Sequence, residues 1–239
     1  LATAPVFLDQ AGTASIDLAF AALTAAALAC LVAWFDEGKP AWLALAAFLA
    51  GSSCGIRHTG YLVCLLLGLA VLCGKNPNRV RTTAGFAGLA LAAALPWLVR
   101  SAVVAGNPVY PFLESVFSPG RLPDASITAF AAHPSIKGTG WKDLLRFPWD
   151  IIMRPGLYDG WTKSPGGLVL LLGIPGLVVG GKRSRWLGGF SVAGGVSFFY
   201  FQRLARYLLP FFVPMMVVAG VAACRLKGLR RSVSVLLLV

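Results

Sequence analysis

Four arginines lie at the ends of apolar runs, where membrane insertion gives no reason for a positive charge: Arg57, Arg100, Arg203 and Arg206. A guanidinium group can bind phosphate through two parallel hydrogen bonds. Ionisable groups near a membrane are also candidates for function. The four arginines could therefore converge on the phosphate or diphosphate of a lipid headgroup. The alternative is four separate arginines whose charged heads extend to the membrane surface.

Carboxylates are scarcer than cations in this chain, with 9 Asp and Glu against 21 Lys and Arg. Asp17 opens an apolar run, where it could accept hydrogen bonds from sugar hydroxyls or act as a general base. It could equally be a first-turn acid that complements the helix dipole. Asp159 and Glu114 are weaker candidates. His58, next to Arg57, could bind a ligand, although a lone histidine more often makes a structural hydrogen bond.

The cysteines indicate no metal site. The chain has five of them and no C-x-x-C pair, and no histidine is spaced to complete a zinc site. Their position within or beside apolar runs is typical of small core residues. We expect no resident cofactor, while a divalent ion bound with a substrate stays open.

The composition predicts an all-α, multi-span membrane protein. Of the 239 residues, 57% are hydrophobic and only 13% are charged, where a soluble domain has about 25% charged residues. The mean hydropathy of +0.76 excludes a water-soluble globule and a disordered chain. The net charge of +12 could indicate nucleic-acid binding. Because the cations lie between apolar runs, we expect a membrane and no nucleic acid.

About seven spans and a truncated eighth are predicted. They cover residues 16–34, 41–56, 60–73, 83–99, 166–180, 186–201, 207–224 and 233–239. The run 60–73 is short, and 41–73 could be one very long helix. Keeping two spans places four basic loops, with eleven Lys and Arg, on one side of the membrane, which the positive-inside rule makes cytoplasmic. A single helix would move the loop around Lys75 and Arg81 to the opposite side, so we keep two.

The segment 100–165 is then a long outer loop between an N-terminal part of the bundle (1–99) and a C-terminal part (166–239). Long loops without a regular fold are often functional. Residues 141–153 predict a short helix in the membrane interface, with Trp, Leu and Ile in lipid while Lys142 and Arg146 meet headgroups. An ordinary amphipathic helix packed on the bundle is equally consistent with this pattern.

Three stretches resemble one family. The sequence Pro-Trp-Leu-Val-Arg ending at Arg100, followed by Gly-Asn-Pro-Val-Tyr-Pro-Phe from Gly106, is similar to the "PW-x-x-R-N … GNPVYPF" segment of bacterial GT-C glycosyltransferases. These are relatives of the family 39 protein mannosyltransferases and the lipid A aminoarabinose transferase. Arg206-Tyr-Leu-Leu-Pro resembles the "RYLLP" that starts one of their late spans, and the stretch around Asp17 resembles the opening of an early span. Ser101 departs from the usual Asn after the arginine.

The resemblance implies an inverting hexosyl or pentosyl transferase in the bacterial inner membrane, which takes a sugar from a polyprenyl-phosphate donor on the outer face. The acceptor would be a lipid, a glycan or a protein. Asp17 matches the family's second acidic position, whereas the main catalytic base would lie in a first outer loop upstream of Leu1. We therefore expect a fragment truncated at both ends. The donor-binding candidates are Arg57, His58, Arg100, Tyr110, Asp159, Arg203, Arg206 and Tyr207.

Two other functions fit the same residues. A transporter or flippase for an anionic lipid or solute would need the arginines but no base. No convincing internal repeat of the kind that transporters often carry is visible, and the polar groups cluster at the outer ends of spans. A non-catalytic membrane subunit is the third possibility. The oligomeric state is not encoded in any motif we recognise.

Overall fold

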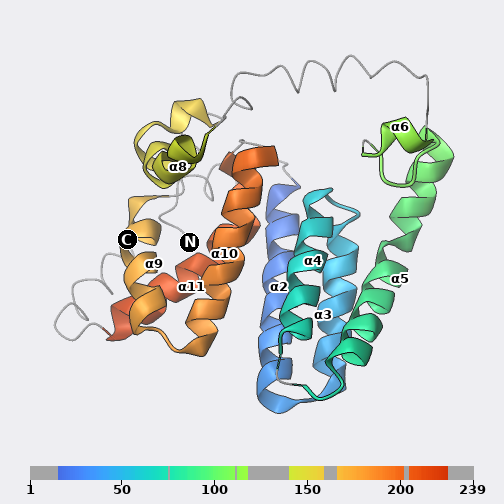
Figure 1. Cartoon of the computed structure of the whole chain (residues 1–239), viewed down its shortest axis with the longest axis horizontal. Helices are drawn as coiled ribbons and strands as arrows, with labels where there is room; N and C mark the ends of the chain where they lie inside the picture. The colour runs from blue at the N-terminus through green and yellow to red at the C-terminus, as the bar shows by residue number, and fades with distance from the viewer. Residues whose placement is uncertain are drawn as a thin grey trace. The chain divides into compact units, whose positions relative to one another are not determined.

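The computed structural model of the chain describes residues 16–74, 76–110, 112–117, 140–158, 166–201 and 205–225, and every regular element in these ranges is a helix (Figure 1). This confirms the predicted all-α class. The α-helices are α2 (Asp17–Glu37), α3 (Pro40–Ser53), α4 (Thr59–Leu72), α5 (Arg79–Ala105), α6 (Glu114–Phe117), α8 (Trp141–Met153), α9 (Gly167–Val179), α10 (Lys182–Phe201) and α11 (Leu209–Arg225). Two 3₁₀ turns, η2 (Pro155–Leu157) and η4 (Ala205–Leu208), complete the set.

Three helical stretches in the described residues are long and apolar enough to cross a membrane: α2, α5 and the continuous stretch Ala205–Arg225. All three coincide with predicted spans. The helices α3 and α4 have 14 residues each, which is about 21 Å at 1.5 Å per residue and shorter than a hydrocarbon core of about 30 Å. The structure therefore supports membrane-spanning helices, while the count of seven stays a prediction.

The predicted separation of the second and third apolar runs is confirmed, because α3 ends at Ser53 and α4 begins at Thr59. The backbone N–H groups of Cys54, Gly55 and Ile56 each bond to the carbonyl three residues earlier. Hydrogen bonds that span three residues are typical of a 3₁₀ turn at the end of an α-helix. The chain reverses over the next residues, so that Arg57 and His58 lie in the turn of a helical hairpin.

The chain forms two compact units. Unit 1 contains Leu1–Ala21 and His133–Val239, and unit 2 contains Ala22–Ala132. In unit 2, α3 packs closely against α5. A Cβ atom added at Gly51 would collide with the backbone of Ala90, and one added at Gly55 would collide with the Trp97 ring. Small residues at such crossings let two helix backbones approach closely, which gives membrane helices van der Waals contact.

Replacing Gly51 by alanine should lower the thermal stability of the protein, because the added methyl group must separate α3 from α5. Overpacking of this kind typically costs about 1–3 kcal/mol. Gly88→Ala on α5 is the matched control, since a Cβ at Gly88 meets no atom within 4 Å. We expect Gly88→Ala to be neutral or slightly stabilising, because alanine is the better helix former. Equal melting temperatures for the two variants in detergent would contradict the close crossing.

Unit 1 contains α8, η2, α9, α10, η4 and α11. A Cβ at Gly176 of α9 would collide with Val218 of α11, and a Cβ at Gly194 of α10 would collide with Phe211 of α11. The helix predicted at 141–153 is present as α8. Its Phe147 ring lies 5.5 Å from that of Phe198 on α10. Helix α8 is therefore attached to the helix bundle through this ring contact.

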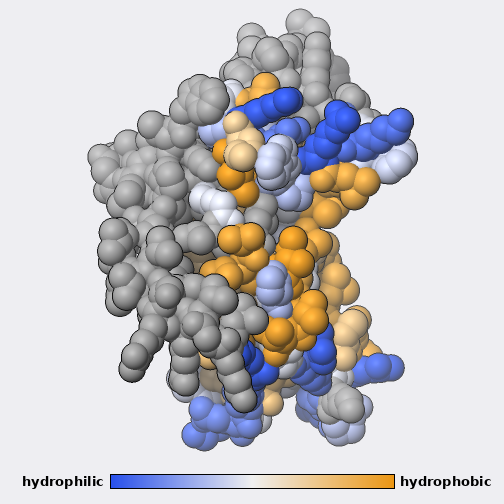
Figure 2. Space-filling model, turned by 90° about the vertical axis from the view of Figure 1, so that its left-hand side faces the viewer, coloured by the Kyte–Doolittle hydropathy of each residue, from blue (hydrophilic) through white to orange (hydrophobic). Residues whose placement is uncertain are grey.

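A second apolar stripe of α8 stays exposed. Trp141, Leu145 and Trp149 follow one another at four-residue intervals and expose 66%, 71% and 63% of their surface. The side of the molecule that carries α8 and α9 also has exposed Leu171, Ile174 and Val178 on α9. Figure 2 shows this side, with apolar surface across its middle and hydrophilic side chains at the two ends. One face of α8 thus packs on the bundle, as the second alternative predicts, while the position of its exposed apolar face in the membrane interface stays a prediction.

Candidate functional site

Within unit 1 the basic turns gather at one end of the helices. Lys182, Arg183 and Arg185 begin α10 directly after α9. Arg225, the last residue of α11, donates a hydrogen bond of 2.7 Å from Nη1 to the carbonyl of Val179, the last residue of α9. Because α11 runs from η4 to Arg225, the Arg206 end of this unit is opposite to the cationic end.

Unit 2 is arranged in the same way. The turn after α2 contains an exposed ion pair between Glu37 and Lys39, at 2.7 Å. Gly74, after α4, lies near Phe35 of α2, because an added Cβ would be 3.2 Å from that ring. These two turns, with the basic start of α5, share one end of the unit. The opposite end contains the turn between α3 and α4 and the segment that follows α5.

Asp17 and Arg206 meet in unit 1. Asp17, the first residue of α2, exposes only 2% of its surface. Its Oδ2 atom lies 3.9 Å from Nε of Arg206, whose side chain is 34% exposed. A buried carboxylate is costly unless a cation or hydrogen-bond donors compensate it. The guanidinium beside Asp17 supplies that compensation, and the first-turn position adds the favourable helix dipole.

Packing one turn away brings these two charges together. Ala21 follows Asp17 by four residues and contacts Leu209, which follows Arg206 by three residues. Residues at these spacings share a helix face, so the apolar contact sets the two charged side chains opposite each other. The N–H of Ala205 also donates a hydrogen bond of 2.7 Å to the carbonyl of Tyr158. This bond attaches the start of η4 to the turn that follows α8.

Two aromatic contacts involve the residues next to this pair. The Arg206 guanidinium carbon lies 5.3 Å from the centre of the Tyr207 ring, a distance suited to a cation–π contact. Tyr158 is buried, and its ring lies 5.6 Å from that of Phe147 on α8. The arginine is therefore held between a buried carboxylate and a neighbouring tyrosine ring.

His58 lies at the corresponding end of unit 2. Its imidazole contacts the Phe112 ring edge-on, with centroids 5.5 Å apart. Partial burial and, to a smaller extent, the positive charge of Arg57 lower the pKa of His58 from its ordinary value of 6.5. This shift favours the neutral imidazole, which can accept one hydrogen bond and donate another. The unfolded state therefore binds this proton more readily than the folded state. Protonation of His58 lowers the free energy of unfolding as the pH falls below the ordinary pKa of 6.5.

The segment after α5 is held by a residue that sequence analysis missed. Asn107 is completely buried, accepts a bond of 2.9 Å from the N–H of Val109, and donates one of 2.7 Å to the carbonyl of Phe112. The Ser101 hydroxyl donates to the carbonyl of Asn107 at 2.8 Å. Gly106, with φ of 71°, ends α5 in the left-handed conformation that glycine favours. The Asn-Pro motif after a glycine was the available signal for this turn.

The remaining predicted site residues fall into two groups. Tyr110 is half-buried in the turn that Asn107 closes, and Arg100 is exposed on α5. Both belong to unit 2, together with Arg57 and His58. Whether they share a site with Asp17 stays a prediction. Asp159 and Arg203 lie outside the described residues.

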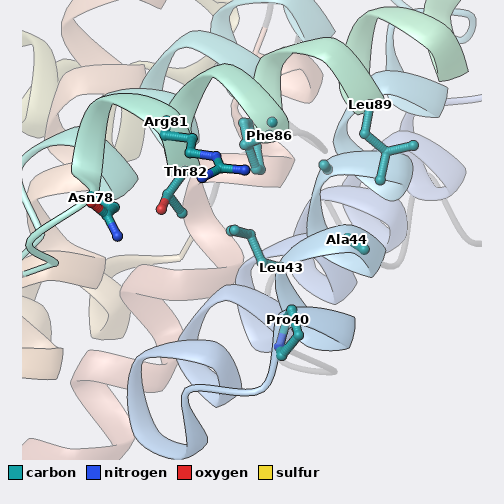
Figure 3. Close-up of a pocket in the computed structure, with 10 residues that line it drawn as sticks. Pro40, Leu43, Ala44, Asn78, Arg81, Thr82, Phe86 and Leu89 are labelled. Carbon is teal, nitrogen blue, oxygen red and sulfur yellow. The ribbon is translucent and has the colours of Figure 1, made fainter.

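A groove of about 410 Å³ lies between α3 and α5 at the basic end of unit 2 (Figure 3). Arg81, Thr82 and Asn78 supply its polar side, while Leu43, Phe86 and Leu89 are among its apolar lining residues. The Thr82 hydroxyl accepts a hydrogen bond of 3.0 Å from Asn76. None of the predicted site residues lines the groove, and it opens at the end opposite to the Arg57–His58 turn. We therefore separate it from the candidate site.

Within the described ranges, no group of three or more His, Cys, Asp or Glu side chains could hold a metal ion. No protein-family model, curated protein or solved structure matches the chain. The arrangement of Asp17, Arg206 and Tyr207 therefore carries the functional argument, together with the resemblance of the three sequence stretches.

Proposed function

We propose that this chain belongs to a membrane glycosyltransferase of the GT-C type, which transfers a sugar from a polyprenyl-phosphate donor to a lipid, glycan or protein acceptor on the outer face of the bacterial inner membrane. The observation that carries the proposal is the buried Asp17 carboxylate set against the partly exposed Arg206 guanidinium. In the proposed topology, seven spans and a further partial one cross the membrane. The cationic ends of both units face the cytoplasm.

In this mechanism Arg206 binds the donor phosphate. Breakage of the bond between sugar and phosphate leaves a second negative charge on the departing polyprenyl phosphate, and a fixed cation stabilises that charge most in the transition state. Asp17 orients the guanidinium from its buried side, so the exposed part of the group meets the phosphate. We thus assign Asp17 a positioning role, while the resemblance places the base that deprotonates the acceptor in a first outer loop.

The other predicted residues keep, in this proposal, the donor-binding roles that the resemblance implies. Tyr207 limits the movement of Arg206 and offers a ring for the sugar or the first isoprene unit. The neutral His58 can hydrogen-bond a sugar hydroxyl without repelling a cation. The proposal also retains, as ligands of the phosphate or sugar, Arg57, Arg100, Tyr110, Asp159 and Arg203.

The direct test uses the full-length protein in detergent with a panel of labelled undecaprenyl-phosphate hexoses and pentoses. Release of undecaprenyl phosphate, together with inversion at the anomeric carbon of the product, is the expected result. The same protein is also reconstituted into vesicles. Movement of the labelled lipid across the bilayer without cleavage of its sugar would favour a flippase and contradict the proposal.

The topology predicts where single cysteines react with an impermeant maleimide in a cysteine-free variant. A cysteine at Val116, which is 65% exposed in α6, should be labelled in spheroplasts, because this segment follows the outer end of α5. A cysteine at Arg183, at the cationic end of α10, should be labelled only after the membrane is opened. Labelling in the reverse order would overturn the proposed orientation.

A further inference from the structure

Two cysteines of the α3–α4 hairpin lie close together in unit 2. The sulfur atoms of Cys54 and Cys64 are 3.7 Å apart. Cys54 is 8% exposed in the turn after α3, whereas Cys64 is partly exposed on the second turn of α4. A disulfide needs its sulfur atoms about 2.05 Å apart and its Cβ atoms close together. Small side-chain movements would bring this pair from its present separation to bonding distance.

The backbone explains why these two thiols meet. Gly60, on the first turn of α4, lies against Cys54, since an added Cβ would be 2.6 Å from the Cys54 nitrogen and 2.7 Å from its Cα atom. The residue four positions after Gly60 shares its helix face, and that residue is Cys64. Close approach of the backbones at Gly60 therefore directs the Cys64 side chain toward Cys54, independently of any attraction between the sulfur atoms.

We propose that Cys54 and Cys64 form an intramolecular disulfide by exchange with a disulfide-bearing oxidant on the outer side of the membrane. The location of the reaction rests on the topology of the proposed function, which places this turn where disulfides persist. Given the oxidant, formation of the bond depends on the geometry of the hairpin and not on the proposed sugar transfer. The disulfide would attach the end of α3 to α4 across the turn that carries Arg57 and His58.

Cys64 is more exposed than Cys54, so it reacts with the oxidant first. The thiolate of Cys64 attacks the oxidant's disulfide, forming a mixed disulfide and releasing one thiolate. The thiolate of Cys54 then attacks the Cys64 sulfur and expels the second thiolate. The two protons lost by the protein thiols go to these leaving groups. One disulfide is thereby reduced to two thiols, while two protein thiols are oxidised to one disulfide.

The test treats the purified full chain in detergent with oxidised glutathione, blocks remaining thiols with N-ethylmaleimide, and maps each cysteine by mass spectrometry. We expect Cys54 and Cys64, two of the five free cysteines, to lose reactivity and to be recovered as one linked peptide pair, lighter by two hydrogen atoms and separated by a phosphine reductant. The exposed Cys73 and Cys224 act as internal controls, which should carry only glutathione adducts.

Two variants test the assigned order. In Cys54→Ser, Cys64 should accumulate as a stable glutathione adduct, because no resolving thiol remains. In Cys64→Ser, Cys54 should stay alkylatable after the protein is unfolded, because burial protects it. A stable glutathione adduct on Cys64 of the wild-type chain would overturn the proposal. The proposal would also be overturned if the Cys54 and Cys64 thiols were both unreacted after Cys73 had been modified.

The state of the pair in cells is read by alkylating intact cells before lysis. A linked pair supports the location on the outer side, and two alkylated thiols contradict it. None of these readouts depends on sugar transfer. Loss of transferase activity and absence of the disulfide are therefore separate results, and each bears on its own proposal.

Discussion

Replacing Arg206 by lysine should reduce release of undecaprenyl phosphate from its sugar donor by about 100-fold, the loss typical when one fixed donor to a developing negative charge is removed. Lysine keeps the positive charge but lacks the planar pair of donors that matches a phosphate. Because this stabilisation grows as the bond breaks, kcat should fall more than donor affinity. The measurement is steady-state turnover in detergent, with donor affinity measured separately.

Arg185→Lys is the matched control for this variant. It makes the same exchange at an exposed arginine of α10, at the opposite, cationic end of unit 1, so turnover should remain at the wild-type level. Thermal unfolding of both variants shows whether the fold is retained. Unchanged turnover in a folded Arg206→Lys variant would remove the assigned role of this arginine. Equal losses in the two variants would indicate a general effect of lysine and contradict a local phosphate site.

The sequence could predict where helices lie, because apolar runs and charged boundaries are local features. The helix α5 covers the predicted run 83–99 and extends it at both ends. Solvated residues such as Arg79 continue the helix beyond its apolar part, where hydropathy gives no signal. In α10 the helix begins at Lys182, four residues before the predicted run, for the same reason. Periodicity and hydropathy therefore locate these helices but not their ends.

The sequence could also identify Asp17 and Arg206 individually, since each is a charge at the boundary of an apolar run. Their contact could not be predicted from local pattern. It depends on the packing of Leu209 against Ala21, and both residues are ordinary apolar members of their helices. Their positions at the boundaries of apolar runs gave no distance, which the tertiary structure supplies.

The roles of two polar residues could not be predicted from the sequence, for different reasons. The amide of Asn107 closes the turn after α5 through backbone groups of Val109 and Phe112, and only the folded turn brings these groups to the amide. The sequence predicts Arg81 only as part of the positive charge of a cytoplasmic loop. The structure places it on the α3–α5 groove, a position that depends on how two helices cross. The number of Lys and Arg residues in a loop predicts the side of the membrane on which the loop lies. It does not predict which residues pack around a given side chain.

Replacing Asp17 by asparagine should lower sugar transfer by about 10-fold, less than the arginine variant does. The amide is nearly isosteric with the carboxylate but removes the charge that faces the Arg206 guanidinium at 3.9 Å. Loss of a fully buried pair partner typically costs about 3–5 kcal/mol. Because Arg206 is one-third exposed, water offsets part of this loss, and we expect a stability change of about 1–2 kcal/mol. Turnover and thermal unfolding measure the two effects separately.

A control and a double variant distinguish positioning of Arg206 from the helix-dipole effect that a first-turn acid produces. Asp143 is also a first-turn acid, at the start of α8, and is exposed. The dipole contribution should therefore be lost in Asp143→Asn as well, with little change in transfer. If Asp17 acts through the arginine, Asp17→Asn combined with Arg206→Lys should lose little more activity than Arg206→Lys alone. Losses that multiply independently would contradict the proposed coupling, because they would show that Asp17 contributes to transfer without holding Arg206 in place.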